Sequence, residues 1–237
     1  MVMRQPSFGG QAASRMDKGA ESAPLVAIAV DVVIFTVTEA GLAVLLRRRD
    51  EAPFAGYWTL PGGFLGDDES PEAGAQRVLA DKVGVEGLYA EQLYTFGKPE
   101  RDPRGRVVSI GFFALMPWNR AAPLAGESHG TAWHTVDALE QLGFDHAEII
   151  GMARNRLASK LAYSTIALQL MPQRFTLSQL QSVYESILGE ALDKRNFRKW
   201  VCSLGCIEAT DEYYRAGKHR PAQLYRVKHP GEVRIIK

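Results

Sequence analysis

Cysteine is almost absent from this sequence, because only Cys202 and Cys206 occur among its 237 residues. Two thiols cannot form the multi-bridge framework of small secreted domains, and two thiols alone make no zinc site, so both classes of protein are excluded. We interpret the two cysteines as core residues, with a redox-active pair as the alternative.

A long hydrophobic run is also missing. The most apolar stretch, residues 26–37, contains Asp31 and is shorter than the roughly 20 residues that span a bilayer. Arg4 is not followed by the apolar core of a signal peptide. We therefore expect a cytoplasmic protein without a membrane partner.

Neither sign of charge dominates the whole chain, whose formal net charge is +1, but the charges are unevenly spread. Residues 172–237 carry 12 Lys and Arg against 7 Asp and Glu, a net charge of +5, whereas residues 1–171 have a net charge of −4. A basic C-terminal part on a slightly acidic body predicts a polyanion-binding module.

Changes in composition and periodicity divide the chain into four parts. The first part, residues 1–22, lacks hydrophobic periodicity and is expected to be a disordered tail. The second holds five apolar runs that predict strands, near residues 26–37, 43–49, 88–96, 107–116 and 131–136. The predicted parts are a tail (1–22), an α/β domain (23–144), a connecting helix (145–171) and a C-terminal domain (172–237).

One stretch, residues 63–85 (GFLGDDESPEAGAQRVLADKVGV), joins an acidic loop to a helix. Ser70 is suited to cap the helix, and Pro71 to its first turn, where a missing N–H costs little. Gly84 is typical of a C-terminal stop. We therefore predict a helix from about Pro71 to Val83.

This stretch resembles the Nudix box, which is Gly, five residues, Glu, seven residues, and Arg-Glu-apolar-x-Glu-Glu-x-Gly-apolar. The resemblance implies that residues 23–144 form the α/β/α sandwich of a Nudix domain. The residues in register are Gly63, Glu69, Arg77, Leu79, Gly84 and Val85, preceded by Leu60-Pro61-Gly62-Gly63.

Two of three metal-binding helix positions in that pattern have lost their carboxylate. In the Nudix family, acidic side chains at these positions hold a divalent metal ion, but here they are Val78, Asp81 and Lys82. Valine offers no oxygen ligand and an ammonium group repels a cation, so we predict no metal site, no required cofactor and no catalytic residue. Our hypothesis is that Lys82 takes the metal's place and pairs with Asp81 or Glu69; alternatively, Lys82 points to solvent.

Arginine is concentrated at two places that could contact phosphate, because a guanidinium group offers paired donors to phosphate oxygens. Residues 47–49 (RRR) end a predicted strand and could instead form a solvated strand edge. Residues 97–106 (GKPERDPRGR) could clamp a pyrophosphate or form a solvent-exposed hairpin. The candidate ligand-binding residues are Arg48, Trp58, Glu69, Arg77, Arg101 and Arg104.

Apolar residues recur at helical spacing after Asp145, which can cap a helix. We predict one long helix from Asp145 to about Leu170, ended by Pro172. It would connect the two domains and could also form a dimer contact.

The C-terminal part has two capped helix starts. Thr176 and Gln179 form a capping box, and Gly189 stops the first helix. Asp193 caps the second helix, which Gly205 ends. Two helices joined by a short turn, the second with a basic first half, predict a helix-turn-helix whose second helix enters the major groove.

A β-hairpin is predicted next, with strands at residues 207–210 and 224–227 around a basic loop. Together with the two helices it forms a winged helix, and arginine near a wing tip commonly contacts DNA. A winged helix used for protein contact is the alternative. The candidate DNA-binding residues are Thr176, Lys194, Arg195, Asn196, Arg198, Lys199, Arg215, Lys218, His219 and Arg220.

A degenerate Nudix domain followed by a winged helix resembles the NrtR family, the Nudix-related transcriptional regulators of NAD metabolism. The segments LVAIAVDVVIF, FAGYWTLPGGFL, RDPRGRVVS, FTLSQLQSVYESILG, LDKRNFRKW and RPAQLYR are similar to that family. The resemblance covers about residues 24–228. It implies a homodimeric, nucleoid-associated repressor of NAD biosynthesis or salvage genes that binds a palindromic operator. ADP-ribose or a related NAD-derived nucleotide would release the DNA.

Two other functions stay open. The chain could be an active Nudix hydrolase, an ADP-ribose pyrophosphatase with an accessory domain, because Glu69, Arg77 and Asp81 are retained. It could also be a regulator whose Nudix domain serves only for dimerisation.

Overall fold

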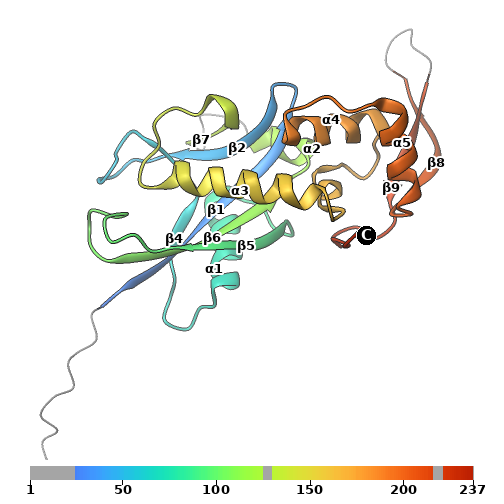
Figure 1. Ribbon diagram of the computed structural model, residues 1–237. Coiled ribbons are helices and arrows are strands. Elements are labelled where there is room, and N and C mark those ends of the chain that lie inside the picture. Colours follow the sequence, from blue (N-terminus) through green and yellow to red (C-terminus); the bar gives the residue numbers. More distant parts are fainter. Residues whose placement is uncertain (1–24, 125–129, 216–220, 237) are drawn as a thin grey trace, which may run out of the picture.

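The computed structural model describes residues 25–124, 130–215 and 221–236 (Figure 1). A mixed seven-stranded sheet with helices on both faces forms the larger part, and two helices with a two-stranded sheet form the C-terminal part. The expected fold class, a Nudix α/β/α sandwich followed by a winged helix, is confirmed. The tail predicted for residues 1–22 lies outside the described residues.

The large sheet is built mainly from antiparallel pairs around one parallel pair. Its path runs β3-β2-β1-β6-β5, with β1 and β6 parallel, while β4 pairs with β1 and β7 with β2. The strands are β1 (Ala27–Thr38), β2 (Gly41–Arg48), β3 (Trp58–Thr59), β4 (Gly62–Phe64), β5 (Tyr89–Phe96), β6 (Val107–Leu115) and β7 (Thr131–Thr135).

Strand β1 is buried on both faces, which explains why its sequence is almost continuously apolar. Val33 and Phe35 point to one face and pack with residues of α3, such as Ile149. Val32 and Ile34 point to the other face and pack with α1. This alternation places one helical layer on each side of the sheet, as Figure 1 shows.

Helix α1 (Pro71–Val78) continues directly into a π-helical turn, η1 (Leu79–Val83). The Ser70 hydroxyl accepts a hydrogen bond from the amide of Ala73, and Gly84 ends the helix in a left-handed conformation at φ 75°. The predicted extent of this helix is therefore confirmed, although the π turn was not foreseen.

The predicted connecting helix is wrong in length and in its cap. Helix α3 spans His146–Leu161, and after a turn the 3-10 helix η5 spans Ile166–Leu170. Asp145 makes no capping hydrogen bond, because Arg101 binds its carboxylate.

Short helical segments α2 (Trp118–Ala121), η2 (Ala122–Leu124) and η4 (Val136–Ala138) complete this part. Within the described ranges, no helix combines the length and apolar character that a membrane span requires.

The C-terminal domain contains α4 (Leu177–Leu188), α5 (Lys194–Ser203), β8 (Ile207–Tyr214) and β9 (Ala222–Val227). Thr176 and Gln179 form the predicted capping box, and Asp193 caps α5 through the amide of Asn196. The wing strands are longer than predicted, because pairing resumes past an irregularity and joins Tyr213 to Gln223.

The two domains share one hydrophobic cluster. It runs from sheet residues such as Phe113 through Leu157 of α3 and Leu180 of α4 to Val201 of α5. The chain end also returns to the connection, where the amide of Thr165 donates to the carbonyl of Arg234 at 2.9 Å and that of Ile236 donates to Tyr163 at 2.8 Å. The domains are therefore packed against each other rather than joined by a free linker.

Candidate functional site

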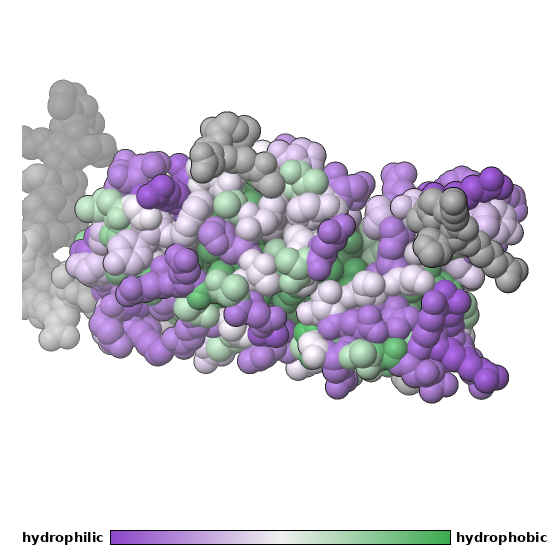
Figure 2. All heavy atoms as spheres, turned by 90° about the horizontal axis from the view of Figure 1, so that it is seen from above, coloured by the Kyte–Doolittle hydropathy of each residue, from purple (hydrophilic) through white to green (hydrophobic). Residues whose placement is uncertain are grey.

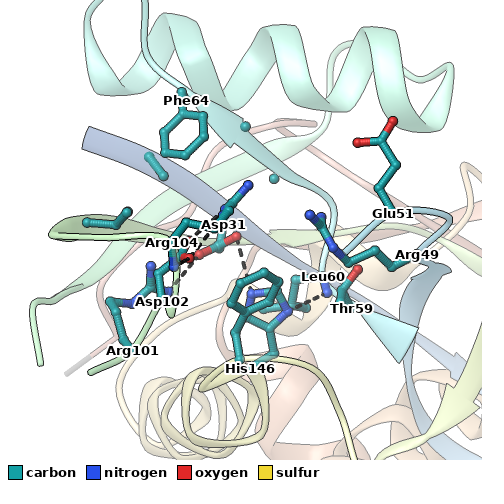
Figure 3. Close-up of a pocket in the computed structure, with 15 residues that line it drawn as sticks. Asp31, Arg49, Glu51, Thr59, Leu60, Phe64, Arg101, Asp102, Arg104 and His146 are labelled. Atoms are coloured by element: carbon teal, nitrogen blue, oxygen red, sulfur yellow. Dashed lines mark hydrogen bonds and ion pairs between the residues drawn. The ribbon is translucent and has the colours of Figure 1, made fainter. Parts of the chain in front are cut away.

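A cavity of about 250 Å³ opens in the Nudix domain at the start of α3 (Figure 3). Figure 3 shows Asp31, Arg101, Asp102 and Arg104 on one side and Arg49 and Glu51 on the other. The remaining walls come from β1, β3 and β4 with their connection, the first residue of β6, and the residues at the start of α3. They include Ala29, Thr59, Leu60, Gly62, Gly63, Phe64, Val107, Phe144 and His146.

A buried ion-pair network closes one side of the cavity. The side chain of Arg101 is only 4% exposed and donates to Asp145 at 2.7 and 2.8 Å and to Asp31 at 3.2 Å. Ser109 Oγ donates to the same Asp31 oxygen at 2.6 Å. Both carboxylates are thus compensated, which is the condition for burying charge at acceptable cost.

His146 is buried beside this network and is neutral at neutral pH. Burial lowers the pKa of its imidazole, and the Leu60 amide donates to Nδ1 at 2.9 Å, which requires Nδ1 to carry no proton. The proton is therefore on Nε2, which lies 3.5 Å from Asp31 Oδ1. The histidine joins the β3–β4 connection to α3.

Aromatic rings and guanidinium groups lie close together around the cavity. Phe144 has a left-handed backbone at φ 57°, rare for an aromatic residue, and its ring lies 4.7 Å from that of Phe54. The guanidinium of Arg49 lies 5.3 Å from the Phe144 ring centre. The guanidinium of Arg104 lies 5.7 Å from the Phe144 ring and 5.3 Å from the Phe64 ring. Such surfaces can stack a planar base.

The loop of residues 97–106 is a hairpin between the antiparallel strands β5 and β6. It is exposed at residues 98–100 and 103–106, as one of the two expected alternatives has it, but it is anchored to the domain between them. Arg101 and Asp102 are buried, and Lys98 pairs with Glu148 of α3 at 2.6 Å. Arg104 donates to both oxygens of Asp102 and thereby lowers the pKa of that carboxyl. Of the two candidates here, Arg101 is fully engaged by carboxylates, whereas Arg104 faces the cavity and is 44% exposed.

The other four ligand candidates lie outside this cavity. Arg48 lines an adjoining hollow, and the indole of Trp58 packs on His134 instead, with ring centres 4.6 Å apart. Glu69 and Arg77 form a two-pronged ion pair at 2.7 Å beside a shallow depression near Phe64. The structure therefore does not bring the six candidates together.

The Nudix-box positions do not fit a metal ion. Both oxygens of Glu69 accept hydrogen bonds from Arg77, one also from the Gly66 amide, and these bonds lower the Glu69 pKa to about 2. Val78 is fully buried in the core, and in the described ranges no three His, Cys, Asp or Glu side chains gather as a metal site would require. The hypothesis that Lys82 pairs with Asp81 or Glu69 is wrong, because no ion pair joins them and Arg77 occupies Glu69.

Five of the DNA-binding candidates lie on α5, the second helix of the winged helix, and all five are exposed. Phe197 and Val201 are buried on the inner face of this helix. Figure 2 shows hydrophilic residues over much of this end of the molecule. The exposed candidates are Lys194, Arg195, Asn196, Arg198 and Lys199.

The remaining DNA-binding candidates have different outcomes. Thr176 is 5% exposed and its hydroxyl is used in the capping box, so the structure does not offer it to DNA. Arg215 is exposed at the end of β8. Lys218, His219 and Arg220 lie outside the described residues.

Comparison with known families assigns both domains. Residues 26–152 match the Nudix domain, and residues 167–227 match the NrtR DNA-binding winged helix domain. The chain is 41% identical over 201 residues to the "ADPR responsive transcriptional repressor NtrR" of Acinetobacter baylyi, covering 83% of this chain and 80% of the relative. The chain belongs to the NrtR family.

Solved NrtR structures are similar throughout this fold. Shewanella oneidensis NrtR complexed with a 27mer DNA has a TM-score of 0.78 and 36% identity, covering 85% of this chain and 93% of that chain. The Nudix domain of the same protein complexed with ADP ribose has a TM-score of 0.50 and 37% identity, covering 60% and 94%.

The chain also resembles Nudix enzymes over its first domain. The "ADP-ribose pyrophosphatase" of Methanocaldococcus jannaschii is 32% identical over 124 residues, which are 52% of this chain and 70% of that protein. Membership of the NrtR family explains why a Nudix domain and a winged helix occur in one chain.

Several cavity residues were not among the candidates. Asp31 could have been singled out from the sequence, because it interrupts the apolar strand β1. His146 and Phe144 could not have been identified from the sequence, because their roles depend on the contact of α3 with the β3–β4 connection.

Proposed function

We propose that this chain is a transcriptional repressor whose Nudix cavity binds ADP-ribose, or a related NAD-derived nucleotide, and thereby releases operator DNA. The observation that carries the proposal is that one hydrophobic cluster joins an arginine-lined cavity to a winged helix with an exposed basic helix α5. The relatives from Acinetobacter and Shewanella support the same reading through their names, which mention ADP-ribose response and DNA.

The proposed DNA contact is made by α5 and the wing. The first turns of α5 would enter the major groove, and a homodimer would place two such helices on the halves of a palindromic operator. Lys194, Arg195 and Asn196 are placed to contact bases or nearby phosphates, and Arg215 to contact phosphate from the wing. The targets would be genes of NAD biosynthesis or salvage.

The proposed coupling element is α3. Its first turn lines the cavity through His146, next to Asp145 of the ion-pair network, and its far end lies where the chain end bonds to residues 163–165. A ligand that binds one arrangement of the domains better than the other shifts the equilibrium toward that arrangement.

The proposed Nudix domain binds its ligand without hydrolysing it. The carboxylates that an active Nudix hydrolase needs are not assembled here, since Val78 is buried and Glu69 is held by Arg77. If the chain is instead an ADP-ribose pyrophosphatase, incubation with ADP-ribose and magnesium will release AMP and ribose 5-phosphate at ordinary turnover.

A gel shift on duplex DNA upstream of NAD-synthesis genes, with and without ADP-ribose, tests the proposal. We expect ADP-ribose to abolish the shift. The variant Arg195→Ala should lose the shift but still bind ADP-ribose. Loss of both activities would contradict the proposal that the winged helix binds DNA and the Nudix domain binds the nucleotide.

A further inference from the structure

Two polar side chains of α4 hold the turn that leads from α4 into α5 (Figure 1). The amide of Leu192 donates to Glu185 Oε1 at 2.9 Å, and the carbonyl of Leu192 accepts from Gln181 Nε2 at 2.9 Å. Gln181 Nε2 also donates to Glu185 Oε1 at 2.9 Å, so the three groups form a closed ring. We call this ring of Gln181, Glu185 and Leu192 the Leu192 clamp.

Gln181 occupies a position where the helix pattern favours an apolar side chain. Leu177, Leu180 and Tyr184 share its face of α4 and are buried, and Gln181 is only 8% exposed among them. A buried amide costs free energy unless it is hydrogen-bonded, so a leucine would serve the packing of α4 better. The amide at this position therefore points to a role beyond packing.

Glu185 also stands against the local preference of its helix. It lies in the last turn of α4, where the partial negative charge of the helix end disfavours a carboxylate. The hydrogen bonds from the Leu192 amide and from Gln181 lower the pKa of its carboxyl, so the carboxylate accepts both bonds at neutral pH. Two locally unfavourable choices thus serve the same set of hydrogen bonds.

The clamp acts directly before the start of the exposed basic helix. Leu192 precedes Asp193, which caps α5 by accepting from the Asn196 amide at 2.8 Å. Lys194 and Arg195 follow in the first turn and are exposed. Because the main chain is helical from this cap onward, the placement of Leu192 fixes where the first turn of α5 lies.

Apolar packing between the two helices does not fix this placement by itself. The rings of Tyr184, Phe197 and Trp200 pack with centres 5.3 to 5.8 Å apart. Apolar attraction has no preferred direction, whereas a hydrogen bond requires a defined distance and angle. The clamp therefore supplies the directional contact at the end of α5 that carries the basic residues.

We propose that Gln181 and Glu185 are positioning residues that hold the first turn of α5 in the orientation needed to contact operator bases. The inference rests on the proposed function, because it takes α5 as the helix that enters the major groove. Base contacts depend on that orientation, whereas the attraction of basic side chains to phosphates is independent of sequence. Loss of the clamp should therefore weaken specific binding and spare non-specific binding.

The test measures fluorescence anisotropy on two labelled duplexes of equal length at the same salt concentration. One is a palindromic operator selected from a pool of random duplexes, and the other is its scrambled sequence. Glu185→Ala should bind the operator about tenfold more weakly than the wild type, which corresponds to the loss of one good base contact. Its matched control is Glu190→Ala, which removes the same charge from an exposed residue of the turn and should retain operator affinity. Both variants should bind the scrambled duplex equally, because they lose the same charge.

Two further variants separate the hydrogen bonds from the charge. Glu185→Gln loses the charge but keeps an oxygen that can accept from the Leu192 amide, so it should retain the preference for the operator. Gln181→Leu removes the donor and fills the buried position with an apolar side chain, so it should remain folded and lose that preference. Melting temperatures and ADP-ribose binding of all variants should stay close to those of the wild type.

Failure of the clamp can be distinguished from failure of the proposed function. If the wild type prefers the operator and Glu185→Ala keeps that preference, the clamp proposal is overturned and the proposed function stands. A similar weakening of both duplexes by Glu185→Ala also overturns it, because that result indicates a general loss of the fold. A wild type that does not distinguish the two duplexes overturns both proposals.

Discussion

Gly62 shows how a single residue allows the cavity to form. A Cβ atom at this position would overlap Asp31 Oδ1 and lie 2.8 Å from the carbonyl oxygen of Val30, because β4 passes directly against β1. Only glycine permits this approach without moving the buried carboxylate.

We predict that Gly62→Ala destabilises the protein by about 1–3 kcal/mol, the usual cost of forcing extra atoms into a packed site. Urea unfolding measures the change. Gly66→Ala is the matched control, since its Cβ would meet nothing nearer than Glu69 Cβ at 3.8 Å. Equal stability of Gly62→Ala and the wild type would show that the approach of β4 to Asp31 is looser than described.

A pH effect is predicted for His146. Its folded pKa lies below the ordinary histidine value of 6.5 because the ring is buried, so the unfolded chain binds more protons as the pH falls below 6.5. Stability therefore decreases as the pH decreases through this window and is retained above it. His134 acts in the same direction, because burial also lowers its pKa.

The variant His146→Asn separates the two histidines. Its side-chain oxygen can still accept the Leu60 amide bond, but it does not titrate. Melting temperatures from pH 5 to pH 7.5 should depend less on pH in the variant than in the wild type. Unchanged pH dependence would mean that His146 is not the neutral, buried group described here.

At the element scale, Arg101 joins the loop of residues 97–106 to β1 and to the start of α3. Its removal would leave Asp31 and Asp145 buried without their cation, and breaking a buried ion pair in this way costs about 3–5 kcal/mol. We therefore predict a loss of this size for Arg101→Ala in urea unfolding.

The control for this prediction is Arg106→Ala in the same loop. Arg106 is exposed, and among the described residues its side chain donates only to the carbonyl of Gly97. Its removal should change stability by about 0.5 kcal/mol or less. A similar effect of both variants would argue against a special role of the Arg101 network.

Elements with local end signals could be predicted from the sequence, and elements fixed by distant contacts could not. Helices α1, α4 and α5 begin and end where their caps and glycines indicate. Helix α3 is shorter than its apolar pattern suggests, because residues 163–165 bond to the returning chain end. The same distinction explains the site: Arg104 was identified from its loop, but Asp31 and His146 meet only when β1 and α3 pack together.

At the scale of the whole molecule, the continuous hydrophobic cluster predicts that the two domains unfold together. Calorimetry of the free protein should show one thermal transition, because α4 packs on α3 and β2 and not only on its own domain. Two separate transitions would contradict this packing and weaken the proposed coupling through α3.

The packing of the two domains against each other also gives a physical reason to expect that a ligand in the Nudix cavity changes the placement of the DNA-binding helix. The sequence indicated two modules, and the family matches confirm a Nudix domain followed by a winged helix. It did not indicate the shared core, since periodicity identifies a buried face but not its partner.

The central claim is that a Nudix cavity without metal ligands controls DNA binding by the winged helix. The most direct test is fluorescence anisotropy of a labelled palindromic operator, selected from a pool of random duplexes, titrated with ADP-ribose in EDTA. The account predicts that ADP-ribose releases the DNA without magnesium and is recovered intact. Release that requires magnesium, or that is accompanied by AMP, would contradict it.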